Sequence, residues 1–215
     1  MKNHFKTFSM RHTLALFFIT LLIACNDTPK KQDTSEPNTK QVLSEKEESS
    51  SNTSGDYSSL YNNDNCDMSI AELAEVLKVP ESNLNILDKI GENKCSFDLK
   101  GFGTNTLDGD SRITWRSTPS SKKQNKKEIA SYLERKEAGL KIMGMDIEMA
   151  ETGDSYIAQQ PAHGRIIIYN ENYDQALLMH YGIKSANTDR TKEQHEELRL
   201  KMTDLANYLL QKHRK

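Results

Sequence analysis

The stretch that decides the fold is GRIIIYNENYDQALLMHY, residues 164–181. Two apolar runs, 166–168 and 176–179, lie on either side of the polar turn 170–172. Apolar side chains at consecutive positions are typical of a strand that is covered on both faces. The sequence therefore predicts two central strands of a sheet.

Three segments with strand periodicity precede this stretch. They are the less regular segment 84–90, the alternating segment 95–99, and the pair Ile113 and Trp115, which follows the Gly-rich loop 101–111. Short strands joined by turns predict an antiparallel meander.

Residues 143–149 have a two-residue period, which predicts a further strand with one buried face. Its apolar positions are Met143, Met145, Ile147 and Met149. We expect these methionines to pack in the core, and a soft thioether site for Cu(I) is the alternative. Residues 156–158 are predicted to form the next short strand.

Three helices are predicted around the sheet. Ser69 and Glu72 have the spacing of a capping box, and the helix that they begin ends before Pro80. A second helix follows the polar stretch 119–127, and an amphipathic helix over 191–212 closes the chain. This order predicts an α+β domain with a mostly antiparallel sheet, packed by an N-terminal, a middle and a long C-terminal helix.

The first 24 residues have the parts of a secretory signal: a basic start, an apolar run over 13–24 and a small residue before Cys25. The run Leu22-Ile23-Ala24-Cys25 resembles the bacterial lipobox. The resemblance implies lipidation of the Cys25 thiol, cleavage before it and N-acylation, so that acyl chains such as palmitate anchor an exported protein to the cell membrane or outer membrane. A plain signal peptide with an incidental Cys25 is the alternative.

Residues 26–65 are rich in Ser, Thr, Asn, Asp, Glu and Lys and poor in apolar side chains. Such a segment cannot bury enough surface to offset the entropy lost on ordering it. We therefore expect three parts: a signal peptide over 1–24, the lipidated cysteine with a disordered tether over 25–65, and a single folded domain over 66–215.

The mature chain is mildly acidic. The sequence has 29 Lys and Arg against 31 Asp and Glu, and removal of residues 1–24 with their three basic side chains leaves 26 against 31. This balance argues against general binding of nucleic acid. One basic cluster is either solvated or contacts an anionic headgroup or polysaccharide. With Trp115, it forms the predicted binding surface: Lys122, Lys123, Lys126 and Lys127.

Cys66 and Cys95 are the two thiols that remain when Cys25 carries lipid. An even pair in an exported protein is typically bridged, so we predict a disulfide that ties the start of the first helix to the second strand. A reactive or metal-bound pair is the alternative. The separation of 29 residues and the lack of a neighbouring His disfavour it.

A further resemblance rests on the order of several motifs. They are C-x-M-S-x-x-E-L-A-x-x-L over 66–77, C-x-F over 95–97, Gly153-Asp154, G-x-I-I-I-Y over 164–169 and the C-terminal helix. Together they resemble small bacterial lipoprotein domains with a PsbP-like fold. The chain departs from that group in having Val79-Pro80 where a Gly commonly precedes the first strand. The resemblance implies the fold over most of 66–212 and no assigned activity.

No catalytic motif is present. The chain lacks a nucleophile elbow, a P-loop and a dinucleotide fingerprint, and Arg199 stands where a metalloprotease helix beginning at His195 needs its second His. Other isolated candidates for catalysis or metal binding each have a simple structural interpretation: His163, His180, Asp154 with Ser155, and the loop Asp108-Gly109-Asp110.

We therefore expect no cofactor and no metal. The sequence favours a binding or interaction module for an unknown envelope protein or ligand. A structural or assembly lipoprotein is the alternative, and an envelope enzyme is less favoured.

Overall fold

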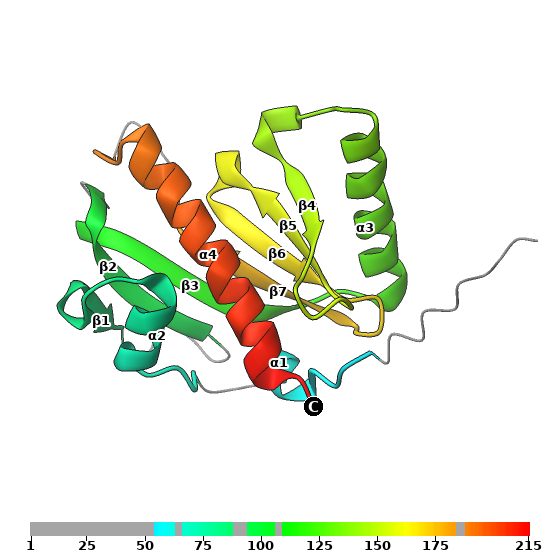
Figure 1. The fold of residues 1–215 in the computed structure, drawn as a ribbon, viewed down its shortest axis with the longest axis horizontal. Coiled ribbons are helices and arrows are strands. Elements are labelled where there is room, and N and C mark those ends of the chain that lie inside the picture. The colour runs from blue at the N-terminus through cyan, green and yellow to red at the C-terminus, as the bar shows by residue number, and fades with distance from the viewer. Residues whose placement is uncertain (1–53, 63–65, 88–93, 106–108, 184–187) are drawn as a thin grey trace, which may run out of the picture. The chain divides into compact units, whose positions relative to one another are not determined.

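The computed structural model of the protein describes residues 54–62, 66–87, 94–105, 109–183 and 188–215. Within these residues, seven strands form one antiparallel sheet in the order β1-β2-β3-β7-β6-β5-β4 (Figure 1). The strands are β1 (Leu84–Ile86), β2 (Lys94–Asn105), β3 (Gly109–Pro119), β4 (Asp146–Met149), β5 (Tyr156–Gln160), β6 (Arg165–Tyr169) and β7 (Gln175–His180). The predicted α+β class and antiparallel sheet are confirmed.

Helices precede, interrupt and close the sheet. They are α1 (Ser58–Tyr61), α2 (Ile70–Leu77), α3 (Lys122–Glu137) and α4 (Lys192–His213), with the short 3-10 helices η1 (Glu81–Asn83), η2 (Ile142–Gly144) and η3 (Pro161–His163). Ser69 and Glu72 make the reciprocal hydrogen bonds of a capping box before α2. Thr191 and Gln194 make a second capping box before α4, the predicted long C-terminal helix.

The sheet buries both of its faces, each against different helices. One face, which we call the α4 face, packs against α2 and α4, and Figure 1 shows α4 crossing it diagonally. The other, which we call the α3 face, packs against Ile129 and Tyr132 of α3. In β6, Ile166 and Ile168 contribute to the core on the α4 face, whereas Ile167 packs on the α3 face. This two-sided burial explains the uninterrupted apolar run that the sequence shows there.

The folded domain begins earlier than predicted. Tyr57, Leu60 and Tyr61 are buried, although the composition of residues 26–65 predicts a disordered tether. The backbone N–H groups of Asp56 and Lys215 each donate to the other's carbonyl oxygen, both at 3.1 Å. The predicted boundary at residue 66 is therefore wrong, because these three apolar side chains pack in the core of the domain. Residues 1–53, which include the predicted signal peptide and Cys25, lie outside the described residues.

The predicted loop over 101–111 is largely a β-hairpin. Strand β2 continues to Asn105 and β3 begins at Gly109, with a shift in pairing register between Leu99 and Thr104. Gly103 lies in this irregular part with a φ of 84°, and a Cβ there would come within 2.7 Å of the backbone of Arg190. The glycine therefore permits both the bulge and the close approach of another segment.

The predicted methionine strand is shorter and more exposed than its sequence period indicates. Met143 belongs to η2 and has a φ of 52°, and Gly144 follows with a φ of 72°. This turn breaks the extended conformation, so the strand begins only at Asp146. Met143 and Met149 are exposed, which makes their predicted burial in the core wrong. The strand predicted over 84–90 is also shorter: β1 ends at Ile86, and residues 88–90 are not described.

Candidate functional site

A cavity of about 180 Å³ lies where the end of α3 meets η2 and the start of β4. We call it the α3-end site. Its lining combines apolar, cationic and acidic side chains: Tyr132, Arg135, Lys136, Gly139, Leu140, Lys141, Ile142, Met145 and Asp146.

The connection between α3 and β4 forms the outer part of this site. We call residues 138–145 the tip loop. The N–H of Leu140 donates to the carbonyl oxygen of Arg135 at 2.9 Å, and Gly139 takes the left-handed conformation that ends many helices. At the other end, the N–H of Met145 donates to the carbonyl oxygen of Ile142 at 2.9 Å. Local backbone hydrogen bonds therefore hold both ends of the tip loop.

Positive charge exceeds negative charge at the α3-end site. The ammonium group of Lys136 is engaged within the protein. Its Nζ lies 2.8 Å from the Asp146 carboxylate and donates to the carbonyl oxygen of Ile147 at 2.6 Å. The guanidinium of Arg135 lies 5.6 Å from the centre of the Tyr132 ring, within the range of a cation–π contact. Lys141 is exposed beside them.

Asp146 stays ionised in this setting. Burial acts to raise the pKa of Asp146, but the hydrogen bonds from Lys136 and the backbone N–H of Ile147 outweigh burial, and the pKa is lowered. The single carboxylate of the lining is thus engaged in an ion pair.

The tip loop exposes three large apolar side chains. Leu140, Ile142 and Met143 are 53%, 49% and 57% exposed. Single exposed apolar residues are ordinary on a protein surface, and the other large ones in the described chain lie apart from this loop: Ile86, Met149, Ile183 and Leu200. Three within four consecutive residues form a local apolar surface next to a cationic cavity. This combination suits a ligand with an apolar part and an anionic part.

Trp115, which the sequence places in a binding surface, is a core residue. It is buried on the α4 face and stacks on Phe97 with ring centres 5.5 Å apart. The prediction is wrong because the strand alternation that identifies β3 also turns this side chain inward. Trp115 and the lysines of α3 do not share a surface.

The four clustered lysines are all exposed, and they lie in the first turns of α3 rather than in a loop before it: Lys122, Lys123, Lys126 and Lys127. The helix start already has acceptors, because Asp174 accepts from the N–H of Lys122 at 3.1 Å and Ser121 accepts from the N–H of Gln124. An added anion would therefore meet side-chain ammonium groups and not these two donors.

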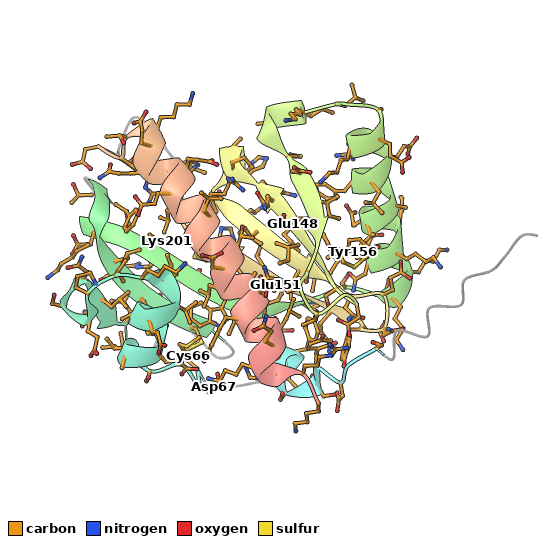
Figure 2. The ribbon with its side chains drawn as sticks, in the orientation of Figure 1. Cys66, Asp67, Glu148, Glu151, Tyr156 and Lys201 are labelled. Atoms are coloured by element: carbon orange, nitrogen blue, oxygen red, sulfur yellow. A yellow bond between two sulfur atoms is a disulfide. The ribbon has the colours of Figure 1, made fainter. Side chains whose placement is uncertain are left out.

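Cys66 and Cys95 lie at disulfide distance, with their Cα atoms 4.9 Å apart. The predicted pair thus comes together and ties the segment before α2 to β2. Figure 2 shows Cys66 and Asp67 close to the C-terminal end of α4. Asp67 accepts through its backbone oxygen from Lys212 Nζ at 3.0 Å, which adds a second tie to the same segment.

The histidines named from the sequence do not converge. His163 is exposed on η3 and His180 is half-buried on β7. On α4, His195 places Nε2 3.0 Å from the carbonyl oxygen of Pro161 and Nδ1 3.4 Å from Arg190. Across the described ranges, no group of three or more His, Cys, Asp or Glu side chains is placed to hold a metal ion.

The adjacent pair Asp154 and Ser155 has a structural setting. Asn170 donates to the Ser155 hydroxyl and to the carbonyl oxygen of Asp154, both at 3.0 Å. The candidate Ca²⁺ loop Asp108-Gly109-Asp110 lies in part outside the described residues.

Arg190 is a buried hub that sequence reasoning missed. Its side chain donates to the carbonyl oxygens of Phe102, Tyr181 and Gly182 and to the Ser111 hydroxyl, at 2.8–3.0 Å. The residue is 4% exposed, and burial lowers the pKa of its guanidinium. These acceptors come from β2, β3 and the segment directly after β7, so Arg190 joins the strands to the start of α4. No local sequence motif around Arg190 predicts such a role.

The tip loop was also missed, although glycines at 139 and 144 flank its apolar residues in the sequence.

In the part of the chain that is described, no helix is both long and apolar enough to cross a membrane. Comparison with known proteins finds no matching family model, no matching curated protein and no matching solved structure.

Proposed function

We propose that the protein is an exported lipoprotein, anchored through acyl chains on Cys25, and that its PsbP-like domain is a binding module of the cell envelope. The observation that supports binding is the α3-end site, where a cavity with excess positive charge opens beside three exposed apolar side chains. Exposed apolar surface of this kind is typical of interaction sites.

The chemistry of the α3-end site defines the ligand class. Its volume of about 180 Å³ is below the roughly 300–1,000 Å³ of sites that enclose a whole drug-sized ligand. It therefore accepts one end of a ligand. Leu140 and Ile142 offer apolar contact, while Lys141 and Arg135 offer positive charge. We propose an amphipathic anion as the ligand.

Binding is favoured over catalysis at this site. Its one carboxylate, Asp146, is paired with Lys136 and its pKa is lowered, so it is a poor general acid at neutral pH. A purely structural or assembly lipoprotein is the alternative, and it predicts that substitutions in the tip loop leave binding unchanged.

The anchor is tested by Cys25→Ser. We expect the processed protein to move from the membrane fraction to the soluble fraction, because the acyl chains are lost. Electrophoretic mobility separates processed protein from precursor. Processed Cys25→Ser protein that still sediments with membranes contradicts the lipid anchor.

Binding is tested with 1-anilinonaphthalene-8-sulfonate, an amphipathic anion whose fluorescence rises on apolar surfaces. We expect Ile142→Asp to weaken its binding, because the substitution puts a like charge beside the cavity. Leu200→Asp is the matched control, since Leu200 is 51% exposed on α4 and lies outside the α3-end site. Equal binding by both variants contradicts the proposed site.

A further inference from the structure

We infer that the tip loop contacts the lipid surface, so that the amphipathic anion of the α3-end site is a phospholipid of the membrane that carries the Cys25 anchor. This inference rests on the proposed function and names its ligand. The domain would then touch the bilayer at two places, through the acylated cysteine and through residues 138–145.

The arrangement of side chains fits an interfacial segment. Leu140, Ile142 and Met143 are each about half exposed, and Lys141 stands between the first two in the chain. Apolar side chains enter the boundary between headgroups and acyl chains, while lysine ammonium groups remain at the level of the headgroup phosphates. Arg135 lines the same site and adds a second cation to it.

Both ends of the tip-loop backbone are already hydrogen-bonded within the protein. An unpaired N–H is costly away from water. The N–H groups of Gly139, Leu140 and Met145 each donate to a carbonyl oxygen within α3 or the tip loop, at 2.9–3.0 Å. Three donors of the loop therefore need no water when the apolar side chains enter the interface.

The distribution of charge favours the tip loop over the groove between α2 and α4 as the surface that approaches anionic lipid. The groove between α2 and α4 is lined by four acids and one lysine: Glu72, Glu75, Glu151, Asp204 and Lys78. Figure 2 shows Glu151 beside α4. Anionic headgroups repel such a surface, whereas the tip loop and the exposed lysines of α3 attract them.

The length of the preceding chain permits both contacts at once. Gly55 is held by Asp154 in the turn after β4, whereas the tip loop precedes β4, so the two lie at opposite ends of that strand. Residues 26–53 lie between Cys25 and the docked segment. A chain of this length extends up to about 90 Å, far more than the roughly 13 Å of a four-residue strand.

The experiment uses the full-length lipidated protein in vesicles of phosphatidylglycerol and phosphatidylethanolamine. With Cys25 acylated and Cys66 paired with Cys95, the variant Leu140→Cys supplies a single reactive thiol for an environment-sensitive nitrobenzoxadiazole label. We expect a blue-shifted emission and quenching by spin-labelled lipid. The matched control is Leu200→Cys, because Leu200 is 51% exposed against 53% for Leu140. Its label should stay water-like.

Further measurements distinguish a failure of the tip-loop contact from a failure of the lipid anchor. Met143→Asp in the Leu140→Cys protein should abolish the blue shift, and vesicles of phosphatidylcholine alone should reduce it. Water-like emission from Leu140→Cys in protein that sediments with the vesicles overturns the inference and leaves the anchor intact. Equal quenching of the two labels also overturns it. Protein that remains in the supernatant contradicts the lipid anchor itself, and with it the inference.

Discussion

The Tyr57 hydroxyl donates a 2.6 Å hydrogen bond to Oδ1 of Asp154, which lies 97 residues further along the chain. Oδ2 of the same carboxylate accepts from the N–H of Gly55 at 2.7 Å. Burial acts to raise the pKa of Asp154, but these hydrogen bonds outweigh burial and the pKa is lowered. Burial, and then the hydrogen bond to Asp154, raise the pKa of Tyr57 to about 12. The pair fastens the segment before α1 to the turn after β4.

Replacing Asp154 by Asn should lower the free energy of unfolding by about 1.5–3 kcal/mol at pH 7, because charge-assisted hydrogen bonds are lost. The folded-state pKa of the carboxyl lies below the ordinary aspartate pKa of 3.8. Its contribution is therefore present above the unfolded-state pKa and disappears as pH falls through the folded-state pKa. Urea unfolding at pH 7 and at acidic pH measures both effects.

The exposed Asp204 provides a control for Asp154. Asp204 pairs with Lys78 at 3.8 Å, and such exposed pairs contribute little. Asp204→Asn should therefore cost less than about 1 kcal/mol at either pH. An Asp154→Asn deficit of the same size at pH 7 and well below pH 3 would contradict the role of the ionised carboxylate.

Lys78→Gly should stabilise the domain by about 0.5–1 kcal/mol. Lys78 ends α2 in the left-handed conformation, with a φ of 53° and a ψ of 51°, directly before Val79-Pro80. Glycine adopts this conformation without the steric cost that a Cβ incurs. Thermal and urea unfolding measure the change, and Lys78→Ala, which keeps the Cβ, should bring no such gain. If both variants are equally stable, the backbone conformation is not the cause.

The double substitution Cys66→Ser and Cys95→Ser should lower the free energy of unfolding by about 3.5 kcal/mol on the chain-entropy account of a loop of this length. Reductant should lower the free energy of unfolding of the wild-type domain by the same amount. Mass spectrometry of unreduced peptides identifies the bond directly. Two thiols that alkylate without reductant in the purified protein would show that the pair is not bridged.

Arg190→Met should destabilise the domain by about 3 kcal/mol, because buried carbonyl oxygens of Phe102 and Tyr181 lose their donor. Arg112→Met is the control. Arg112 pairs with Asp98 at 3.1 Å nearer the surface, and its loss should cost less than about 1 kcal/mol. Equal midpoints in urea for the two variants would refute the idea that Arg190 holds the strands to α4.

The parts of the fold that follow from local patterns could be predicted. Residues 164–181 form β6 and β7. Because both faces of these strands are buried, their apolar residues occur in consecutive runs, which the sequence shows on either side of a polar turn. The Ser69 cap needs only Glu72, three residues away. Cys66 and Cys95 could be paired because the chain offers few thiols in a predicted oxidising compartment.

The parts that depend on distant partners could not be predicted. Tyr57 docks through Asp154, and Arg190 collects acceptors from three other segments, so neither shows a local pattern. The prediction of a strand beginning at Met143 was wrong for another reason. The methionines and glycines of the tip loop alternate as a strand would, but Met143 and Gly144 both adopt positive φ and turn the chain instead. A period of two describes side-chain spacing and does not fix the backbone.

The paired backbones of Asp56 and Lys215 place the two ends of the domain side by side. A short peptide joining them would close the chain into a ring, which makes the domain a candidate for circular permutation with new ends opened elsewhere. Conversely, a fluorescent protein or affinity tag fused after Lys215 would lie beside Asp56, at the described start of the domain. Reporters placed there compete with the N-terminal attachment, so an internal surface position is the better place for a label.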